Sequence, residues 1–201
     1  MRSFSKGDKS ICVHFERPPV FDDIKTGDSI AVNGVCLTVE KVTEEKVTGG
    51  EIRFSLGHET LRVLQWNPEH WLNKPQNMER SLRLSDRIHG HFVSGHVEGI
   101  GLILKSQSEG DNWMISVEIP ENLLPFVWKK GSMTFHGVSL TVNEIRGQQV
   151  DVCLVPETQK RTNLTTLQEG ERIYLEPDYL AKALYHFATH GIVFPQHQGG
   201  K

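Results

Sequence analysis

The heptapeptide NGVCLTV, at Asn33–Val39, returns as HGVSLTV at His136–Val142. The two copies lie 103 positions apart, and the same separation aligns RSFSKGD from Arg2 with KSQSEGD from Lys105. A third pair, HETLRVL from His58 and PETQKRT from Pro156, follows in the same order. Three matched blocks in one order predict a duplicated domain, because a self-similar chain builds one supersecondary unit twice.

The repeat is incomplete at its start. Met1 aligns with Leu104, so the segment GHFVSGHVEGIGLI at Gly90–Ile103 has no counterpart in the first copy. Since a strand is usually about 5–6 residues long, the first copy is expected to lack roughly one strand and its turn. Either the start of the chain is truncated relative to its relatives, or the first barrel is closed differently.

Composition excludes several classes of protein. A net charge of −3 gives no basic field for nucleic acid or an anionic membrane, and no apolar run is long enough to span a bilayer. The first ten residues, MRSFSKGDKS, lack the apolar core of a secretion signal. The three cysteines form no CxxC pair, which indicates reduced thiols and a cytoplasmic location rather than a disulfide framework.

Local patterns predict a mainly β chain. Alternating, β-branched runs predict strands at 10–16, 28–42, 51–56, 92–104, 113–119, 132–145 and 149–155, with glycine-containing turns between them. Short strands at this spacing, duplicated, indicate two small antiparallel barrels or sandwiches. The exception is 178–191, an amphipathic helix with Asp178 as its N-cap and Gly191 as its stop. The last residues, 192–201, are expected to be disordered.

The repeated strand presents small polar side chains. Alternate residues of a strand share a face, so Cys36 and Thr38 lie together in one copy, and Ser139 and Thr141 in the other. Each pair follows a glycine, which lets another backbone approach closely. Such a surface suits a flat heterocycle whose edges need hydrogen-bond partners. The alternative is a strand with a solvent-facing Ser/Thr side.

Cys36 is also a candidate nucleophile. Its counterpart is Ser139, and no local Cys–His signature accompanies it, so a hydrogen-bonding or neighbouring-group role is the preferred interpretation. His89, His91 and His96 invite a zinc hypothesis, but no cysteine or carboxylate is spaced to complete a four-ligand site. Histidines that bond a ligand, or ordinary polar strand residues, are preferred.

Two further blocks follow predicted strands. In His58-Glu59-Thr60 and Pro156-Glu157-Thr158, the threonine and backbone amides are suited to an imide or carbonyl edge, and a local turn is the alternative. Lys130, in KKGS, is by default a solvated charge.

Together these residues resemble the riboflavin synthase family. The segments GDSIAVNGVCLTV, HETLR, SDRIHGHFVSGHVEGIG, KKGSMTFHGVSLTV and VPETQKRTNL match that family in order, from about Arg2 to Tyr185. The resemblance implies an all-β fold of two tandem six-stranded Greek-key barrels, the first lacking its N-terminal strand, and a C-terminal helix. The implied domains are an N-terminal lumazine-binding barrel at 1–89, a C-terminal one at 90–177, a trimerisation helix at 178–191 and the tail at 192–201.

The resemblance also implies a reaction. Two molecules of 6,7-dimethyl-8-ribityllumazine, one in each barrel, exchange a four-carbon unit and become riboflavin and 5-amino-6-ribitylamino-uracil. The implied active site lies between the N-terminal barrel of one subunit and the C-terminal barrel of another in a homotrimer. It uses no metal or organic cofactor, and an association with lumazine synthase is compatible with it.

The resemblance assigns residues to both pockets. Catalytic positions are Cys36, His91, His96, Lys130, Ser139 and Asp178, where a helix N-cap explains Asp178 equally well. Substrate-binding positions are Cys36, Leu37, Thr38, Ser55, Leu56, Gly57, His58, Glu59, Thr60, Gly95, His96, Val97 and, from the partner subunit, Lys130 in the first pocket, and Ser139, Leu140, Thr141, Cys153, Leu154, Val155, Pro156, Glu157 and Thr158 in the second.

The chain departs from the family pattern in three places. The opening Met-Phe-Thr-Gly strand is not present, His136 stands where the family has an aspartate, and EHWLNKPQNMER replaces a Gly-Asp turn and strand. A damaged first barrel is expected to weaken catalysis more than binding, so a non-catalytic lumazine or flavin carrier is the alternative function. A flavin-dependent reductase is a weaker one, because the chain has no GxGxxG motif or βαβ pattern.

Overall fold

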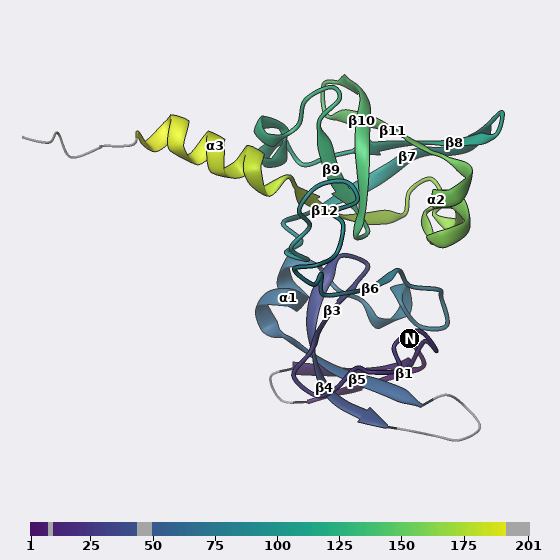
Figure 1. Cartoon of the computed structure of the whole chain (residues 1–201). Helices are drawn as coiled ribbons and strands as arrows, with labels where there is room; N and C mark the ends of the chain where they lie inside the picture. The colour runs from purple at the N-terminus through teal and green to yellow at the C-terminus, as the bar shows by residue number, and fades with distance from the viewer. Residues whose placement is uncertain (8–9, 44–49, 192–201) are drawn as a thin grey trace, which may run out of the picture.

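The computed structural model describes residues 1–7, 10–43 and 50–191, so the predicted tail lies outside the described residues. Two β units follow one another along the chain, and helix α3 (Tyr179–His190) projects from the second (Figure 1). The all-β fold class with a C-terminal helix is therefore confirmed.

The first unit is a six-stranded sheet in the order β1-β2-β5-β4-β3-β6. Its strands are β1 (Ser3–Lys6), β2 (Ser10–Glu16), β3 (Ser29–Val32), β4 (Val35–Thr43), β5 (Glu51–Gly57) and β6 (Met78–Arg80). Helix α1 (His58–Val63) and the 3-10 turn η1 (Pro68–His70) connect β5 to β6.

The second unit is a closed barrel in the order β10-β11-β8-β7-β12-β9. Its strands are β7 (Gly99–Glu109), β8 (Asn112–Glu118), β9 (Ser132–Phe135), β10 (Val138–Arg146), β11 (Gln149–Leu154) and β12 (Arg172–Pro177). The shorter elements are η2 (Glu121–Phe126), α2 (Pro156–Arg161) and η3 (Leu164–Thr166). Strands β1, β6 and β12 were not predicted, and the strand predicted from residue 92 begins only at Gly99.

Each unit has its own apolar core, built by alternation along the strands. In β4, Val35, Leu37 and Val39 are buried, whereas Cys36 and Thr38 are exposed, as the period-two pattern predicts. The second core repeats the arrangement with Leu140 and Val142 inside the closed barrel. In both units, the repeated heptapeptide therefore contributes alternate apolar side chains to the core and presents the polar ones on the outer face of the strand.

The first sheet stays open between β1 and β6. In the second barrel, Gly99–Leu102 of β7 pair with β12, and β7 pairs with β8 from Leu102 onward, with a bulge between Ile103 and Lys105. Among the strands of the described residues, β1 pairs with β2 alone.

A tryptophan from the divergent EHWLNKPQNMER segment packs into the core of this open sheet. Trp71 is only 1% exposed and packs on Phe15, Trp66 and Tyr174, with ring centroids 5.8–6.2 Å apart. The Met1 side chain is buried in the same core, and the Met1 carbonyl accepts a hydrogen bond from the Asn73 amide at 3.0 Å. The departure from the family pattern thus contributes apolar packing to a sheet that lacks a closing strand pair.

The two units meet through their repeated turns. Asn33-Gly34 and His136-Gly137 are two-residue hairpin turns with positive φ at both positions, 48° and 81° in one and 48° and 82° in the other. A Cβ atom added to Gly34 would lie 2.7 Å from the Gly137 nitrogen, and one on Gly137 would lie 2.6 Å from the Gly34 nitrogen. The glycines therefore serve both the turn conformation and the contact between the units.

The first residue of each turn performs the same task with different chemistry. The Asn33 Oδ1 accepts a hydrogen bond from the Asn77 amide at 2.9 Å, and the His136 Nδ1 accepts one from the Tyr174 amide at 2.8 Å. The His136 ring is buried, stacks on the Tyr174 ring at 4.8 Å, and does not line the cavity that holds Ser139. The histidine therefore supports the joint between the barrels and does not replace a carboxylate in that cavity.

A Gly34→Ala substitution tests the turn contact. Gly170→Ala is the matched control, because its φ of 82° is nearly the same but nothing lies within 4 Å of the added Cβ. The control should lose about 1–2 kcal/mol of unfolding free energy through left-handed strain. Gly34→Ala should lose about 1–3 kcal/mol more because the Cβ overlaps Gly137. Urea unfolding of both variants measures the difference, and equal losses would contradict the contact.

His136 should make the fold acid-sensitive. Burial lowers the pKa of His136 from 6.5 to about 3. Between these two pH values the imidazole is therefore protonated in the unfolded chain and neutral in the folded chain. The stability that neutral His136 contributes is complete above pH 6.5 and is lost progressively as the pH falls toward 3. His136→Asn keeps an acceptor for the Tyr174 amide without titrating, and should flatten this part of the stability–pH curve. An unchanged pH dependence would contradict the assignment.

Candidate active site

A cavity of about 580 Å³ lies between the two units. Its walls come from β3 and β4, from residues 77–82, from Gly137–Ser139 and α2, and from residues 87–95 of the segment that links β6 to β7. Cys36 and Ser139, the residues that differ between the two copies of the repeat, both line this cavity. Their juxtaposition makes it the candidate active site within one chain.

The linking segment contacts both repeated positions. The Cys36 amide donates a hydrogen bond to the Gly95 carbonyl at 2.7 Å, and the His91 Nδ1 lies 2.7 Å from the Ser139 Oγ. One short stretch of backbone thus connects β4 of the first unit with β10 of the second. These residues do not form the strand that their alternation predicts, since their hydrogen bonds run across the joint.

A buried carboxylate fixes this stretch. Glu176 of β12 is 3% exposed and accepts hydrogen bonds from the Ser94 amide and hydroxyl, both at 2.7 Å, and from the Gly95 amide at 3.0 Å. Three donors satisfy a charge that would otherwise be costly to bury. Because Gly95 in turn bonds to Cys36, Glu176 sets the position of the linking segment against the first unit.

His91 is held at both ring nitrogens. Its Nε2 lies 3.1 Å from the Thr134 Oγ1, opposite the contact with Ser139. Burial lowers the pKa of His91, against opposing effects of Asp178 and Glu176. A neutral imidazole of this kind can accept a proton at one nitrogen while the other donates, which is the requirement for proton transfer at neutral pH.

Glu79 of β6 opens into the same cavity at the repeat position that matches Glu176 in β12. Its carboxyl group has no hydrogen-bond or ion-pair partner among the described residues, although its backbone belongs to the β3–β6 pairing. Glu79 is exposed toward the cavity, but partial desolvation by the cavity walls, together with the charge of Glu176, raises its pKa. The two matched carboxyl groups therefore have different surroundings: Glu176 is bound by three donors beside the cavity, whereas Glu79 lines the cavity and has a raised pKa.

The predicted site residues fall into three groups. Six line the cavity: Cys36, His91, Gly95, Ser139, Glu157 and Thr158. Four have side chains inside the cores, so only their backbone can reach a ligand: Leu37, Leu56, Leu140 and Leu154. The rest lie outside the cavity on exposed or half-buried surface: Thr38, Ser55, Gly57, His58, Glu59, Thr60, His96, Val97, Lys130, Thr141, Cys153, Val155, Pro156 and Asp178.

Asp178 has the structural role that its position also allowed. Its Oδ1 accepts a hydrogen bond from the Leu180 amide at 2.8 Å, which makes it the N-cap of α3. Its charge also acts on His91. In the described part of the chain, no group of three or more His, Cys, Asp or Glu residues lies close enough to hold a metal ion.

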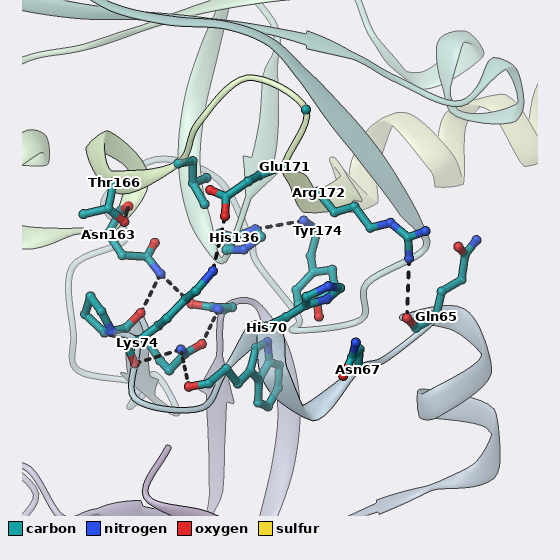
Figure 2. Close-up of a pocket in the computed structure, with 16 residues that line it drawn as sticks. Gln65, Asn67, His70, Lys74, His136, Asn163, Thr166, Glu171, Arg172 and Tyr174 are labelled. Carbon is teal, nitrogen blue, oxygen red and sulfur yellow. Dashed lines mark hydrogen bonds and ion pairs between the residues drawn. The ribbon is translucent and has the colours of Figure 1, made fainter.

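A second cavity, of about 540 Å³, lies between the units in the region of Trp71 and Tyr174 (Figure 2). Its polar groups mostly bind one another. Lys74 pairs with Glu171 at 3.2 Å, and the Asn163 side-chain amide donates to the Asn33 Oδ1 and the Pro75 carbonyl. Figure 2 shows these contacts crossing from one unit to the other, so this cavity is part of the structural joint.

The sequence matches a known domain twice. Residues 2–80 and 94–178 each match the model of the lumazine binding domain. This chain belongs to the riboflavin synthase family. It is 38% identical to the riboflavin synthase of Chlamydia muridarum over 78% of this chain and 74% of the relative, and 33% identical to that of Photobacterium leiognathi over 81% and 72%. The family is one of transferases.

Solved structures support the fold. LumP in complex with 6,7-dimethyl-8-(1'-D-ribityl) lumazine superposes with a TM-score of 0.74 at 18% identity, covering 88% of this chain and 92% of LumP. LumP in complex with riboflavin superposes equally well. At this identity the likeness shows the shared architecture alone. Within the described ranges, no helix is both long and apolar enough to cross a membrane.

Glu176, Ser94 and Glu79 were missed by sequence reasoning. The only signal for the carboxylates is their matched place in NMER and YLEP, which is too short to stand out before the register is known. Ser94 is local to the GHFVSGHV motif, but its partner is 82 positions away in the sequence.

Glu176→Gln tests how the linking segment is held. The amide NH₂ that replaces one oxygen would face a backbone or hydroxyl donor, and hydrogen bonds to charged groups are worth about 1.5–3 kcal/mol. The Cys36 amide, which depends on Gly95, should lose protection from hydrogen exchange by about tenfold or more. Glu79→Gln, at the matched position, should leave that protection unchanged. Equal protection in both variants would show that Glu176 does not hold the segment.

Proposed function

We propose that the chain is a riboflavin synthase that converts two molecules of 6,7-dimethyl-8-ribityllumazine into riboflavin and 5-amino-6-ribitylamino-uracil. The observation that carries this proposal is the pair of polar strands that the two units present, one for each substrate molecule. Relatives named riboflavin synthase, at 33–38% identity over about 80% of the chain, support the same reaction.

The two proposed seats share a design. In the first unit the strand register places Ser29 opposite Thr38, and in the second it places Ser132 opposite Thr141. Ser55 to Thr60 and Cys153 to Thr158 would form the next wall of each seat, contributing backbone where their leucines enter the core. Hydroxyls and backbone amides suit a pteridine edge and a ribityl chain, both of which need many hydrogen-bond partners.

The proposed catalysis relies on positioning and proton transfer. The 7-methyl protons of a lumazine are acidified by the ring, so a neutral imidazole beside the seat is a suitable base. His91, held by Ser139 and Thr134, supplies such a group, and the Glu79 carboxyl is a candidate proton donor in the same cavity. Placing two substrates together accounts for much of the remaining barrier.

The homotrimer belongs to the same proposal. Helix α3 carries exposed Leu180, Leu184 and Phe187, an apolar face that an assembly of helices would cover. His96 and Lys130 lie outside the cavity of their own chain, which agrees with a site completed by a partner subunit.

A non-catalytic lumazine or flavin carrier is the second candidate. The open first sheet favours it, because a loosened seat affects alignment of two substrates more than binding of one. The LumP complexes have this architecture with 6,7-dimethyl-8-(1'-D-ribityl) lumazine, riboflavin and flavin mononucleotide as ligands.

Incubation of the purified chain with 6,7-dimethyl-8-ribityllumazine separates the two functions. We expect riboflavin to appear, measured by its absorbance, with one molecule formed for every two substrate molecules consumed. His91→Ala should lower the rate by about 10²–10⁴, the usual contribution of a general base. His70→Ala, in the structural joint, is the matched control. Tight binding without any riboflavin would support the carrier instead.

A further inference from the structure

A second chemically organised group lies on the outer face of the first sheet. Cys12 and His14 are two positions apart on β2, so both point away from the core, while Val13 between them is fully buried. The Cys12 Sγ lies 3.5 Å from the His14 Nε2, and the His14 Nδ1 lies 2.7 Å from the Glu51 Oε1 on β5. Thiol, imidazole and carboxylate thus form one hydrogen-bonded chain.

The Glu51 carboxylate determines which nitrogen of His14 carries the proton. A carboxylate acceptor at Nδ1 keeps the proton on that nitrogen, which leaves the Nε2 lone pair directed at the Cys12 S–H. A nucleophile in contact with a base that a third group orients is the arrangement of activated nucleophiles in general. All three residues are half-buried, so small reagents reach a group that is also sheltered from bulk water.

The surrounding charges explain why the base matters. Burial raises the pKa of the Cys12 thiol, and the carboxylates of Glu40 and Glu51 act in the same direction. The guanidinium of Arg53 and a hydrogen bond with Ser5 oppose them. With the thiol mostly protonated at neutral pH, its reaction requires a group that removes the proton as the sulfur attacks.

We propose that Cys12 is a modification site that reacts with hydroperoxides, with His14 as its base. The Cys12 sulfur attacks one peroxide oxygen, so an S–O bond forms and the O–O bond breaks. The thiol proton passes to His14 Nε2 and then to the departing oxygen. The sulfur is oxidised to a sulfenic acid, and hydrogen peroxide is reduced to water. The charge of Arg53, which acts on Cys12, stabilises the negative charge that develops on sulfur as the proton leaves.

This site is separate from the proposed reaction. Neither Cys12 nor His14 lines the cavity with Cys36 and Ser139, and Glu51 is not among its walls. Across the sheet, Cys12 stands opposite Ser55 on β5. The chemistry proposed for Cys12 requires no lumazine and would hold if the chain were a carrier.

The test is oxidation of the full chain with hydrogen peroxide at neutral pH, followed by trapping with dimedone and mass mapping of all three cysteines. We expect Cys12 to be labelled, and the labelling rate to fall at least tenfold in His14→Gln, since a general base contributes about 10²–10⁴. Glu51→Gln should give an intermediate rate, because the imidazole remains but loses its fixed orientation. The exposed Cys36 provides the internal control and should be labelled equally in all three proteins.

Two results would overturn the proposal: Cys12 unlabelled in the native chain while Cys36 reacts, or Cys12 labelled at the same rate in His14→Gln. If His14→Gln fails to fold by circular dichroism, Glu51→Gln decides the matter, and an unchanged Cys12 rate in that variant overturns the proposal. A labelling rate at Cys12 that depends on both residues establishes the base-assisted thiol.

Discussion

The contact between Gly34 and Gly137 is the constraint on which the rest of the molecule depends. Both turns need positive φ, and both must let another backbone come within contact distance, so neither position accepts a side chain. The contact between the turns fixes which surfaces of the two units face each other on either side of it. One side becomes the polar joint around Asn163 and Lys74, and the other becomes the cavity that contains Cys36 and Ser139. A local requirement of hairpin geometry thus places the functional groups of two distant segments together.

Sequence reasoning succeeded where structure follows from local pattern. The alternation of β4 and β10, the duplicated sheet and the Asp178 cap all depend on residues a few positions apart. It failed where distant partners decide the outcome. Residues 92–98 read as a strand because their side chains alternate, but Ser94 and Gly95 donate to Glu176, so no strand forms there. The Cys12–His14 pair was also overlooked, since its carboxylate comes from another strand.

Asn33 and His136 show how a duplicated position can diverge while its task is kept. Each side chain accepts one backbone N–H from the segment that runs past its turn, Asn77 before β6 in one unit and Tyr174 of β12 in the other, and the acceptor is an amide oxygen in the first and an imidazole nitrogen in the second. The imidazole adds a stacking surface for Tyr174, and it introduces a group whose protonation would remove the acceptor. A substitution that looks like the loss of a catalytic carboxylate is therefore explained by the hydrogen bonding of a turn.

The contact between the two turns is reciprocal and therefore has the local symmetry of a dimer. Gly34 faces Gly137 in the same way that Gly137 faces Gly34, which is the pattern of an isologous interface across a two-fold axis. A tandem chain built on such a contact is equivalent to a dimer of single barrels joined by a tether. The tether makes the second barrel a permanent neighbour at a high effective concentration. It also frees the two halves from identity, so that cysteine and serine can occupy corresponding places in one molecule.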